Sequence, residues 1–261
     1  MLYGTIYGDI AGSTFEYKFF GSDYNFVEII DESKYTDDTV MTLAVADWLL
    51  SNDRTSENLI KFLQYYGQKY PKAGYGATFC MWLVDKTPKP YNSWGNGAAM
   101  RVSPCAWIAR SLEESETLAE KSAKVTHNHP EGIKGAKAVA SAIFLARDKA
   151  SKVTIKEYII NNYEYNLNRT VEEIIKSGYE FDVSCQGSVP EAIICFLESN
   201  DYEDCIKKAI SLGGDTDTQA AIAGSIAEAF YGFPEHLKPI VENKLPNHLL
   251  STLKLFNNDC K

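Results

Sequence analysis

Gly213-Gly214-Asp215-Thr216-Asp217-Thr218 leads directly into an alanine-rich segment, residues 218–230, in which Ile222, Ile226 and Phe230 recur at a helical spacing. Apolar residues that repeat every three to four positions lie on one face of a helix. Small alanine side chains let such a helix pack closely, because the distance between helix axes depends on the side chains at the contact. We therefore expect this segment to form a helix at the centre of a helical bundle.

Helical patterns also occur in the rest of the chain. Residues 39–51 and 133–147 carry apolar side chains at helical spacing. Four Ser/Thr-x-x-Glu patterns, typical of capping boxes at helix starts, begin at Thr117, Thr154, Thr170 and Ser188. The stretch 86–104, with its glycines and prolines, is the longest predicted loop, and residues 25–30 could form a short strand or an extended loop.

Length and composition favour one globular domain. The chain has 261 residues, of which 45% are hydrophobic and 23% are charged, and these values suit a packed core. Because strand signals are few, the sequence predicts an all-α fold. We expect a compact orthogonal bundle of about ten or more helices that forms a single domain over residues 1–261.

The net charge and the spacing of the cysteines argue against several kinds of partner and binding site. A net charge of -9 disfavours a nucleic-acid backbone or an anionic membrane as the main partner. The six cysteines lack the spacing of a zinc knuckle or a redox motif, and the chain shows neither a signal peptide nor a long apolar run. We therefore expect reduced thiols in a cytoplasmic protein.

Two acidic motifs are the main candidates for chemistry. Thr36-Asp37-Asp38-Thr39 and Asp215-Thr216-Asp217-Thr218 each place two carboxylates within three residues, next to a predicted helix. Carboxylates so close repel one another unless a cation lies between them, and hard divalent cations prefer oxygen ligands. The alternative is helix capping, since Asp and Thr are common N-cap residues and acids in a first turn favour the helix dipole. The doubled acids in both motifs favour a metal site.

Two more segments combine glycines with polar groups. The segment from Gly8 to Glu16 carries two acids, although it could also be a capped helix start. In the segment Ser93-Trp94-Gly95-Asn96-Gly97-Ala98-Ala99-Met100-Arg101, glycines flank an asparagine, so exposed backbone N–H groups could hold a phosphate. Trp94 could stack on a flat ring, and Arg101 could pair with a phosphate or with an acid. The alternative for this segment is an Asn-Gly turn with a core tryptophan.

The segment Thr126-His127-Asn128-His129-Pro130 contains two histidines two positions apart. Residues at this spacing do not share a helix face, and neither cysteine nor a third histidine is near. We therefore expect a hydrogen-bonding or structural role for this segment rather than zinc binding.

These five segments, in the order in which they follow one another along the chain, resemble the ADP-ribosylglycohydrolase family. This family includes the dinitrogenase-reductase-activating glycohydrolases and the ADP-ribosyl-acceptor hydrolases. The resemblance extends from Tyr7 to about Gly232, and rests on the uncommon motifs TDDT, GNGAAMR and GGDTDT. It implies an all-α fold with a dinuclear Mg²⁺ or Mn²⁺ site in a cleft.

The resemblance also implies roles for individual residues. The metal ligands would be Thr36, Asp37, Asp38, Asp215, Asp217 and Thr218. The substrate would be bound by Ser93, Trp94, Gly95, Asn96, Gly97, Met100 and His127. Glu16 matches a glutamate near the substrate and the metals, so Glu16 and Asp38 are both candidates for the catalytic base. Trp94 departs from the tyrosine or phenylalanine of many members, which leaves its stacking partner open.

The function implied by the resemblance is metal-dependent hydrolysis that removes ADP-ribose from a modified acceptor by cleaving the glycosidic bond at C1″. The acceptor could be an arginine or serine side chain, a nucleobase or a small molecule. Two alternatives fit the same residues: a metal-dependent nucleotide phosphohydrolase, and a non-catalytic module that binds ADP-ribose. We expect a monomer.

Overall fold

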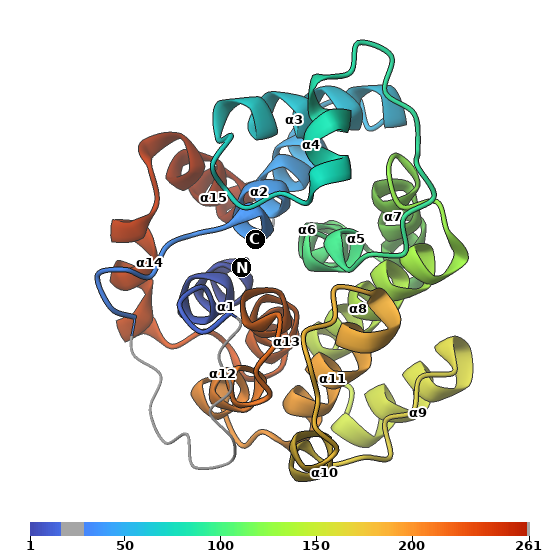
Figure 1. Ribbon diagram of the computed structural model, residues 1–261, viewed down its shortest axis with the longest axis vertical. Coiled ribbons are helices and arrows are strands. Elements are labelled where there is room, and N and C mark those ends of the chain that lie inside the picture. The colour runs from blue at the N-terminus through green and yellow to red at the C-terminus, as the bar shows by residue number, and fades with distance from the viewer. Residues whose placement is uncertain (17–28, 260–261) are drawn as a thin grey trace.

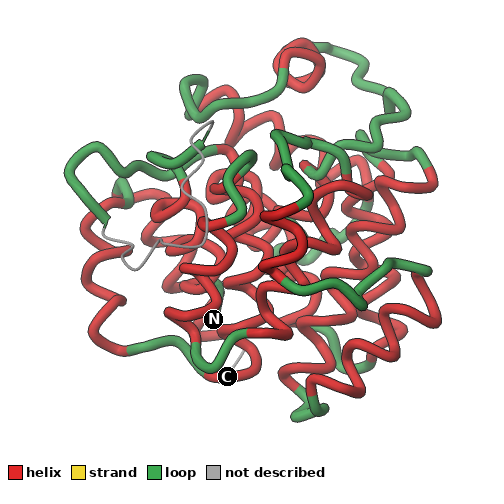
Figure 2. The backbone as a smooth tube through the Cα atoms, turned by 60° about the horizontal axis from the view of Figure 1, so that its bottom comes forward, coloured by secondary structure: helices red, strands yellow, loops and turns green. Residues whose placement is uncertain are grey.

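In the computed structural model, which describes residues 1–16 and 29–259, every regular element of the described chain is a helix (Figures 1 and 2). The prediction of an all-α fold is therefore confirmed. The helices are α1 (Tyr3–Gly12), α2 (Asp37–Leu50), α3 (Ser56–Lys69), α4 (Ala77–Val84), α5 (Gly97–Met100), α6 (Ser103–Ile108), α7 (Leu112–Lys124), α8 (Pro130–Arg147), α9 (Lys152–Tyr163), α10 (Val171–Lys176), α11 (Cys185–Glu198), α12 (Tyr202–Ser211), α13 (Thr216–Tyr231), the 3₁₀ helix η2 (Glu235–Leu237), α14 (Lys238–Lys244) and α15 (Asn247–Asp259).

Helix α13 lies at the centre of the bundle, as its alanine-rich sequence predicts. It packs against α1, α12, α11 and α8, which surround it in Figure 1. Every residue from Thr216 to Ala229 is buried, including polar ones such as Gln219 and Glu228. A helix that is buried on all sides needs apolar or small residues around its whole circumference, and the alanines supply them.

A row of glycines lets α1 approach α13 closely. Gly4, Gly8 and Gly12 lie one helical turn apart, and a Cβ atom at any of them would overlap the backbone of α13. Gly4 faces Gly224 and Glu228 in the second half of α13, whereas Gly12 faces Thr216 at its start, so the two helices are antiparallel. This contact places the end of α1 beside the beginning of α13, where two acids of the second motif lie.

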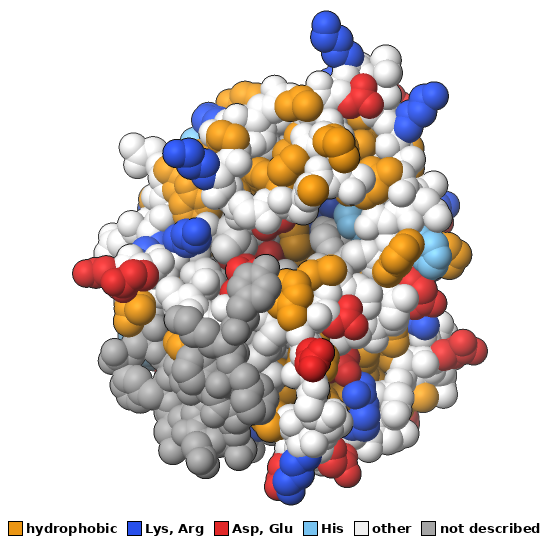
Figure 3. Space-filling view, viewed as in Figure 1, with side chains coloured by type: hydrophobic (Ala, Val, Ile, Leu, Met, Phe, Trp, Pro, Cys, Tyr) orange, Lys and Arg blue, Asp and Glu red, His pale blue; other side chains and the backbone are white. Residues whose placement is uncertain are grey.

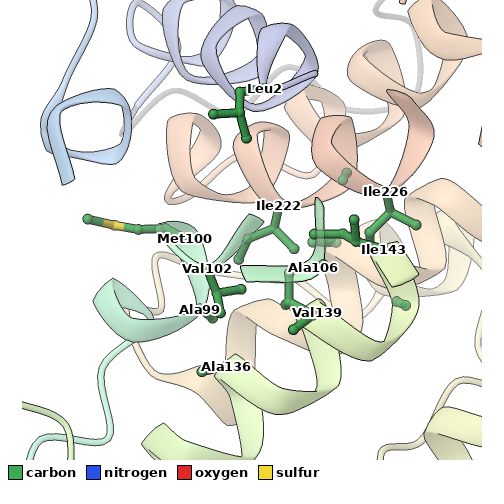
Figure 4. Close-up of a cluster of buried hydrophobic side chains, with 14 of the residues drawn as sticks. Leu2, Ala99, Met100, Val102, Ala106, Ala136, Val139, Ile143, Ile222 and Ile226 are labelled. Atoms are coloured by element: carbon green, nitrogen blue, oxygen red, sulfur yellow. The ribbon is translucent and has the colours of Figure 1, made fainter. Parts of the chain in front are cut away.

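Hydrophobic side chains fill the space between α13 and the helices on its other side. Figure 4 shows Ile222 of α13 pointing toward Val102, the N-cap of α6, and Ala106 of α6, while Ile226 of α13 lies beside Ile143 of α8. All of these side chains are buried. Their removal from water stabilises the packing by about 25 cal/mol for each Å² of apolar surface, and holds the start of α13 in place relative to α5 and α6.

Three of the four predicted capping boxes are wrong. Thr117, Thr154 and Ser188 lie inside α7, α9 and α11, whose N-caps are instead Ser111, Ser151 and Ser184. Residues three apart also adjoin inside a helix, so the same pattern occurs after a helix has begun. Only the box at Thr170 is confirmed, with both reciprocal hydrogen bonds to Glu173 present.

Other local expectations need correction. The segment from Gly8 to Glu16 is not a helix start, because its first half lies at the end of α1. The predicted loop 86–104 is irregular only as far as Asn96, the N-cap of α5, and its last two residues begin α6. Of the possible strand at 25–30, residues 25–28 lie outside the described residues and 29–30 belong to no regular element. None of the described helices combines the length and the apolar character that crossing a membrane requires.

We predict that Gly8→Ala destabilises the protein, because the added methyl group meets the carbonyl of Ala220 on α13. Overpacking of this kind costs about 1–3 kcal/mol or more. Urea unfolding followed by circular dichroism measures the change. Gly76→Ala is the matched control, since its Cβ meets no atom within 4 Å and only an N-cap preference of less than about 1 kcal/mol is lost. Equal stability of the Gly8→Ala variant and the wild type would contradict the packing account.

Candidate active site

A pocket of about 830 Å³ opens on the face shown in Figure 3, with acidic side chains at its floor and hydrophobic side chains along its rim. Three stretches of chain form most of its wall: residues 73–79 around the start of α4, residues 91–97, and residues 181–184. The floor is formed by the starts of α2 and α13. The residues that the sequence analysis gives as metal ligands, substrate-binding residues or candidate bases all line this pocket.

The two acidic motifs meet at the floor of the pocket. Thr36 is the N-cap of α2, and Asp215 is the N-cap of α13. The hydroxyl of Thr218 donates to Oδ2 of Asp38 over 3.1 Å, which joins the motifs directly. Glu16, Asp215 and Asp217 offer carboxylate oxygens that all lie within 4.8 Å of one another. The fold therefore brings together residues that are about 180 positions apart in the sequence.

Helix capping accounts for only part of these motifs. The side chain of Thr36 does accept a hydrogen bond from the backbone N–H of Asp38, as a capping residue would. In contrast, the side chain of Asp215 makes no capping hydrogen bond. It accepts instead from the amide of Asn96, over 2.6 Å. Side-chain capping therefore fails for Asp215, although Asp217 does lie in the first turn of α13, as the alternative expects.

Asp9 is a member of the cluster that the sequence-based list of site residues omits. It is fully buried in α1 and shares a group of ligand atoms within 4.8 Å with Asp38 and Asp217. Its two oxygens accept hydrogen bonds from the backbone N–H and hydroxyl groups of both Thr36 and Thr39. Asp9 therefore holds the first turn of α2 in position. The sequence did contain a signal for Asp9, because it lies between Gly8 and Gly12 and glycines permit a close approach of two backbones.

Burial and mutual repulsion raise the pKa values of four of these acids. The pKa of Asp9 rises to about 7 and that of Asp37 to about 8. The pKa values of Asp38 and Asp215 lie well above the usual range of a carboxyl group. For each of the four, burial is the largest cause and the charge of Asp217 is the next. The cluster is thus electrostatically unfavourable unless protons or cations neutralise it.

The cluster fits divalent cations better than it fits a structural salt bridge. Of the residues that the structure describes, no lysine, arginine or histidine forms an ion pair with Asp9, Asp37, Asp38, Asp215 or Asp217. Oδ1 of Asp38 is buried without a hydrogen-bond partner among the described residues. A buried carboxylate oxygen without a partner is costly, and the all-oxygen set around it suits Mg²⁺ or Mn²⁺.

The loop that precedes α5 is fastened to the start of α11. Gly95 forms an antiparallel bridge with Ser184, in which Asn96 N–H donates to Val183 and Cys185 N–H donates to Trp94. Because Gly95 N–H also donates to the hydroxyl of Ser93, the backbone donors of Gly95 and Asn96 are already used. This corrects the expectation that this loop presents a row of exposed N–H groups to a phosphate.

Asn96 also differs from the expectation. Its side chain is buried, and its amide donates to Asp215 and, over 3.2 Å, to the hydroxyl of Ser188. Hydrogen bonding by Asn96 lowers the pKa of Asp215 against the larger effects that raise it. In this structure the asparagine therefore orients an acid of the floor, although it also lines the pocket.

The other predicted substrate-binding residues occupy the wall and the rim. Trp94 is 53% exposed, so it is not the core tryptophan of the alternative, and its ring meets His129 edge-on with centroids 5.5 Å apart. Met100 is buried, with its sulfur 4.0 Å from the hydroxyl of Thr218. His127 is buried against Thr126.

Arg101 pairs with no acid in the part of the chain that the structure describes. Its guanidinium group is buried, and its hydrogen bonds to described residues go to the carbonyls of Gly97 and Ser122 and to the hydroxyl of Thr126. It therefore ties the turn of α5 to the end of α7.

Comparisons with known proteins agree with this fold and with the motifs. The chain is 30% identical over 262 residues to the ADP-ribosylhydrolase ARH3 of Mus musculus, an alignment that covers 77% of this chain and 70% of that protein. It is 27% identical over 270 residues to the ADP-ribosylarginine hydrolase Tri1 of Pseudomonas putida, covering 88% and 69% of the two chains. A solved structure titled ADP-ribosylglycohydrolase-related protein complex shares the fold, with a TM-score of 0.70, 20% identity, and coverage of 100% of this chain and 96% of that one.

The family comparison covers nearly the whole chain. The model of the family described as ADP-ribosylglycohydrolase matches residues 1–257, which include α1, both acidic motifs and the loop before α5. The chain therefore belongs to the ADP-ribosylglycohydrolase family and is an enzyme of that family.

Proposed function

We propose that this enzyme removes ADP-ribose from a modified acceptor by hydrolysing the glycosidic bond at C1″, with two Mg²⁺ or Mn²⁺ ions bound at the floor of the pocket. The observation that carries the proposal is the cluster of buried aspartates. Among the described residues, no cationic side chain forms an ion pair with Asp9, Asp37, Asp38, Asp215 or Asp217, and Oδ1 of Asp38 has no hydrogen-bond partner. The names of two relatives, ADP-ribosylhydrolase and ADP-ribosylarginine hydrolase, support ADP-ribose as the transferred group.

In this proposal, the cations are held by oxygen atoms of the two acidic motifs. The ligands are Thr36, Asp37, Asp38, Asp215, Asp217 and Thr218. When bound, such ions neutralise the carboxylates and lower the pKa of water. Asp9 and Asn96 hold these ligands in position: Asp9 accepts hydrogen bonds from the first turn of α2, and Asn96 donates one to the carboxylate of Asp215.

Glu16 is the better candidate for the base that accepts a proton from water. Asp38 is only 1% exposed, with one oxygen engaged by Thr218 and the other buried, which suits a permanent ligand. Glu16 is partly exposed and lines the pocket beside Asp215 and Asp217. Cleavage at C1″ develops positive charge on the sugar ring, and a carboxylate next to the ring would stabilise that charge as well.

The opposite wall of the pocket offers places for the rest of ADP-ribose. The first residue of α5, Gly97, lies next to the imidazole of His127. A ring nitrogen of His127, which could donate a hydrogen bond, therefore lies beside the backbone at the start of a helix. Trp94 at the rim is exposed and aromatic, and could stack on a flat base. We propose that the diphosphate and its adjacent ribose lie between these groups and the carboxylate floor.

We predict that Asp217→Asn lowers the rate of ADP-ribose release by about 100-fold or more, because the variant loses a carboxylate ligand at the centre of the cluster. Release is measured from arginine-, serine- and nucleic-acid-linked ADP-ribose, with Mg²⁺ or Mn²⁺ present and with the product identified. Asp201→Asn is the matched control, since Asp201 caps α12 and asparagine caps equally well. Wild-type rates in Asp217→Asn would refute the metal assignment, and release of phosphate instead of ADP-ribose would indicate a phosphohydrolase.

A second prediction separates catalysis from metal binding. Glu16→Gln keeps the size of the side chain but removes its basicity, so the turnover number should fall by about 10² to 10⁴. Calorimetric titration with Mn²⁺ should show that cation binding is retained. If turnover stays at the wild-type level, Glu16 is not the base, and Asp38 becomes the remaining candidate.

A further inference from the structure

A chain of hydrogen bonds connects Arg101 to His127 through the hydroxyl of Thr126. Nη2 of Arg101 lies 2.9 Å from Oγ1 of Thr126, and this oxygen lies 2.7 Å from Nδ1 of His127. Thr126 is fully buried, Arg101 is 1% exposed and His127 is 5% exposed. The three side chains therefore interact largely out of contact with bulk water. In such surroundings a donor or acceptor that is left without a partner is costly, so the direction of each hydrogen bond can be worked out.

The direction of these hydrogen bonds follows from the donors and acceptors. Arginine can only donate, so Oγ1 of Thr126 accepts from it. The single hydroxyl proton can then go either to Nδ1 of His127 or to the carbonyl of Ala123, which lies 3.5 Å away. That carbonyl already accepts the backbone N–H groups of Thr126 and His127, over 3.1 and 2.8 Å. The shorter contact with Nδ1 is the better one, so Nδ1 accepts.

A neutral imidazole whose Nδ1 accepts must carry its proton on Nε2. The imidazole is neutral because burial, and next the charge of Arg101, lower the pKa of His127 well below its usual range. Nε2 faces the loop before α5: a Cβ at Gly97 would lie 3.2 Å from it, and one at Gly95 would lie 3.6 Å from it. Both glycines and His127 line the pocket.

We propose that Arg101 and Thr126 are positioning residues that fix His127 as its Nε2–H tautomer, so that it donates a hydrogen bond to an acceptor oxygen of the bound ligand. The oxygen would belong to the diphosphate or to the hydroxyl groups of the adjacent ribose. This inference rests on the proposed function for the identity of the ligand, but the tautomer itself does not depend on it. It also gives Arg101 a role different from direct pairing with a phosphate.

The tautomer is measured directly by long-range ¹H–¹⁵N correlation spectra of the protein labelled at histidine. The chain has four histidines, and a His127→Gln spectrum identifies the signals of His127. We expect the Nε2–H pattern in the wild type. In Thr126→Val, which lacks the hydroxyl, we expect a mixture of both tautomers. Thr126→Ser keeps the hydroxyl and should retain the wild-type pattern. A wild-type spectrum of the Nδ1–H form or of a protonated ring would overturn the proposal, as would an unchanged Nε2–H pattern in Thr126→Val.

Ligand titrations complete the test. Calorimetry should show that Thr126→Val binds ADP-ribose about five- to tenfold more weakly than the wild type, the effect of one hydrogen bond, while Thr126→Ser binds within about twofold. Titration with ADP narrows the acceptor: a shift of Nε2 with ADP indicates the diphosphate or the ribose of adenosine, and a shift with ADP-ribose alone indicates the terminal ribose. If neither ligand shifts Nε2, His127 does not donate to the ligand and the proposal fails. Absence of hydrolysis with an intact Nε2–H tautomer would contradict the proposed function instead.

Discussion

The arrangement of the site depends on the close antiparallel contact between α1 and α13. Three glycines of α1 face the backbone of α13, and the hydroxyl of Thr216 donates to the carbonyl of Gly12 where the helices meet. This contact carries Asp9 to the position from which it holds the first turn of α2. The start of α2 is thereby fixed beside the start of α13. Without that approach, the two acidic motifs would lie at the starts of two unrelated helices.

This arrangement is electrostatically unfavourable, because it brings several buried carboxylates close together. Buried carboxylates raise the pKa values of their neighbours, and Asp217 is the main charged contributor for each of the four affected acids. Hydrogen bonds from threonines and from Asn96 offset part of the repulsion, but they leave an oxygen of Asp38 without a partner among the described residues. In the proposed function, divalent cations would satisfy that oxygen and the excess charge together.

The sequence predicts those parts of this account that are local. The alanine-rich pattern of residues 218–230 identifies the central helix, and doubled acids identify both motifs, because each signal lies within a few residues. The roles of Asp9, Asn96 and Arg101 depend instead on partners 27, 119 and 25 residues away. Their side chains point toward those partners only after the helices have packed. The capping pattern failed for a related reason, since residues three apart adjoin throughout a helix and not only at its start.

The most direct test of the central claim is the location of bound metal. Crystals of the protein grown with Mn²⁺ should give two anomalous-scattering peaks at the floor of the pocket, within coordination distance of oxygens of Asp37, Asp38, Asp215 and Asp217. Such peaks would establish that the repelling carboxylates form a dinuclear centre. Electron density for the ordered carboxylates without an anomalous peak, at saturating Mn²⁺ and neutral pH, would contradict the account.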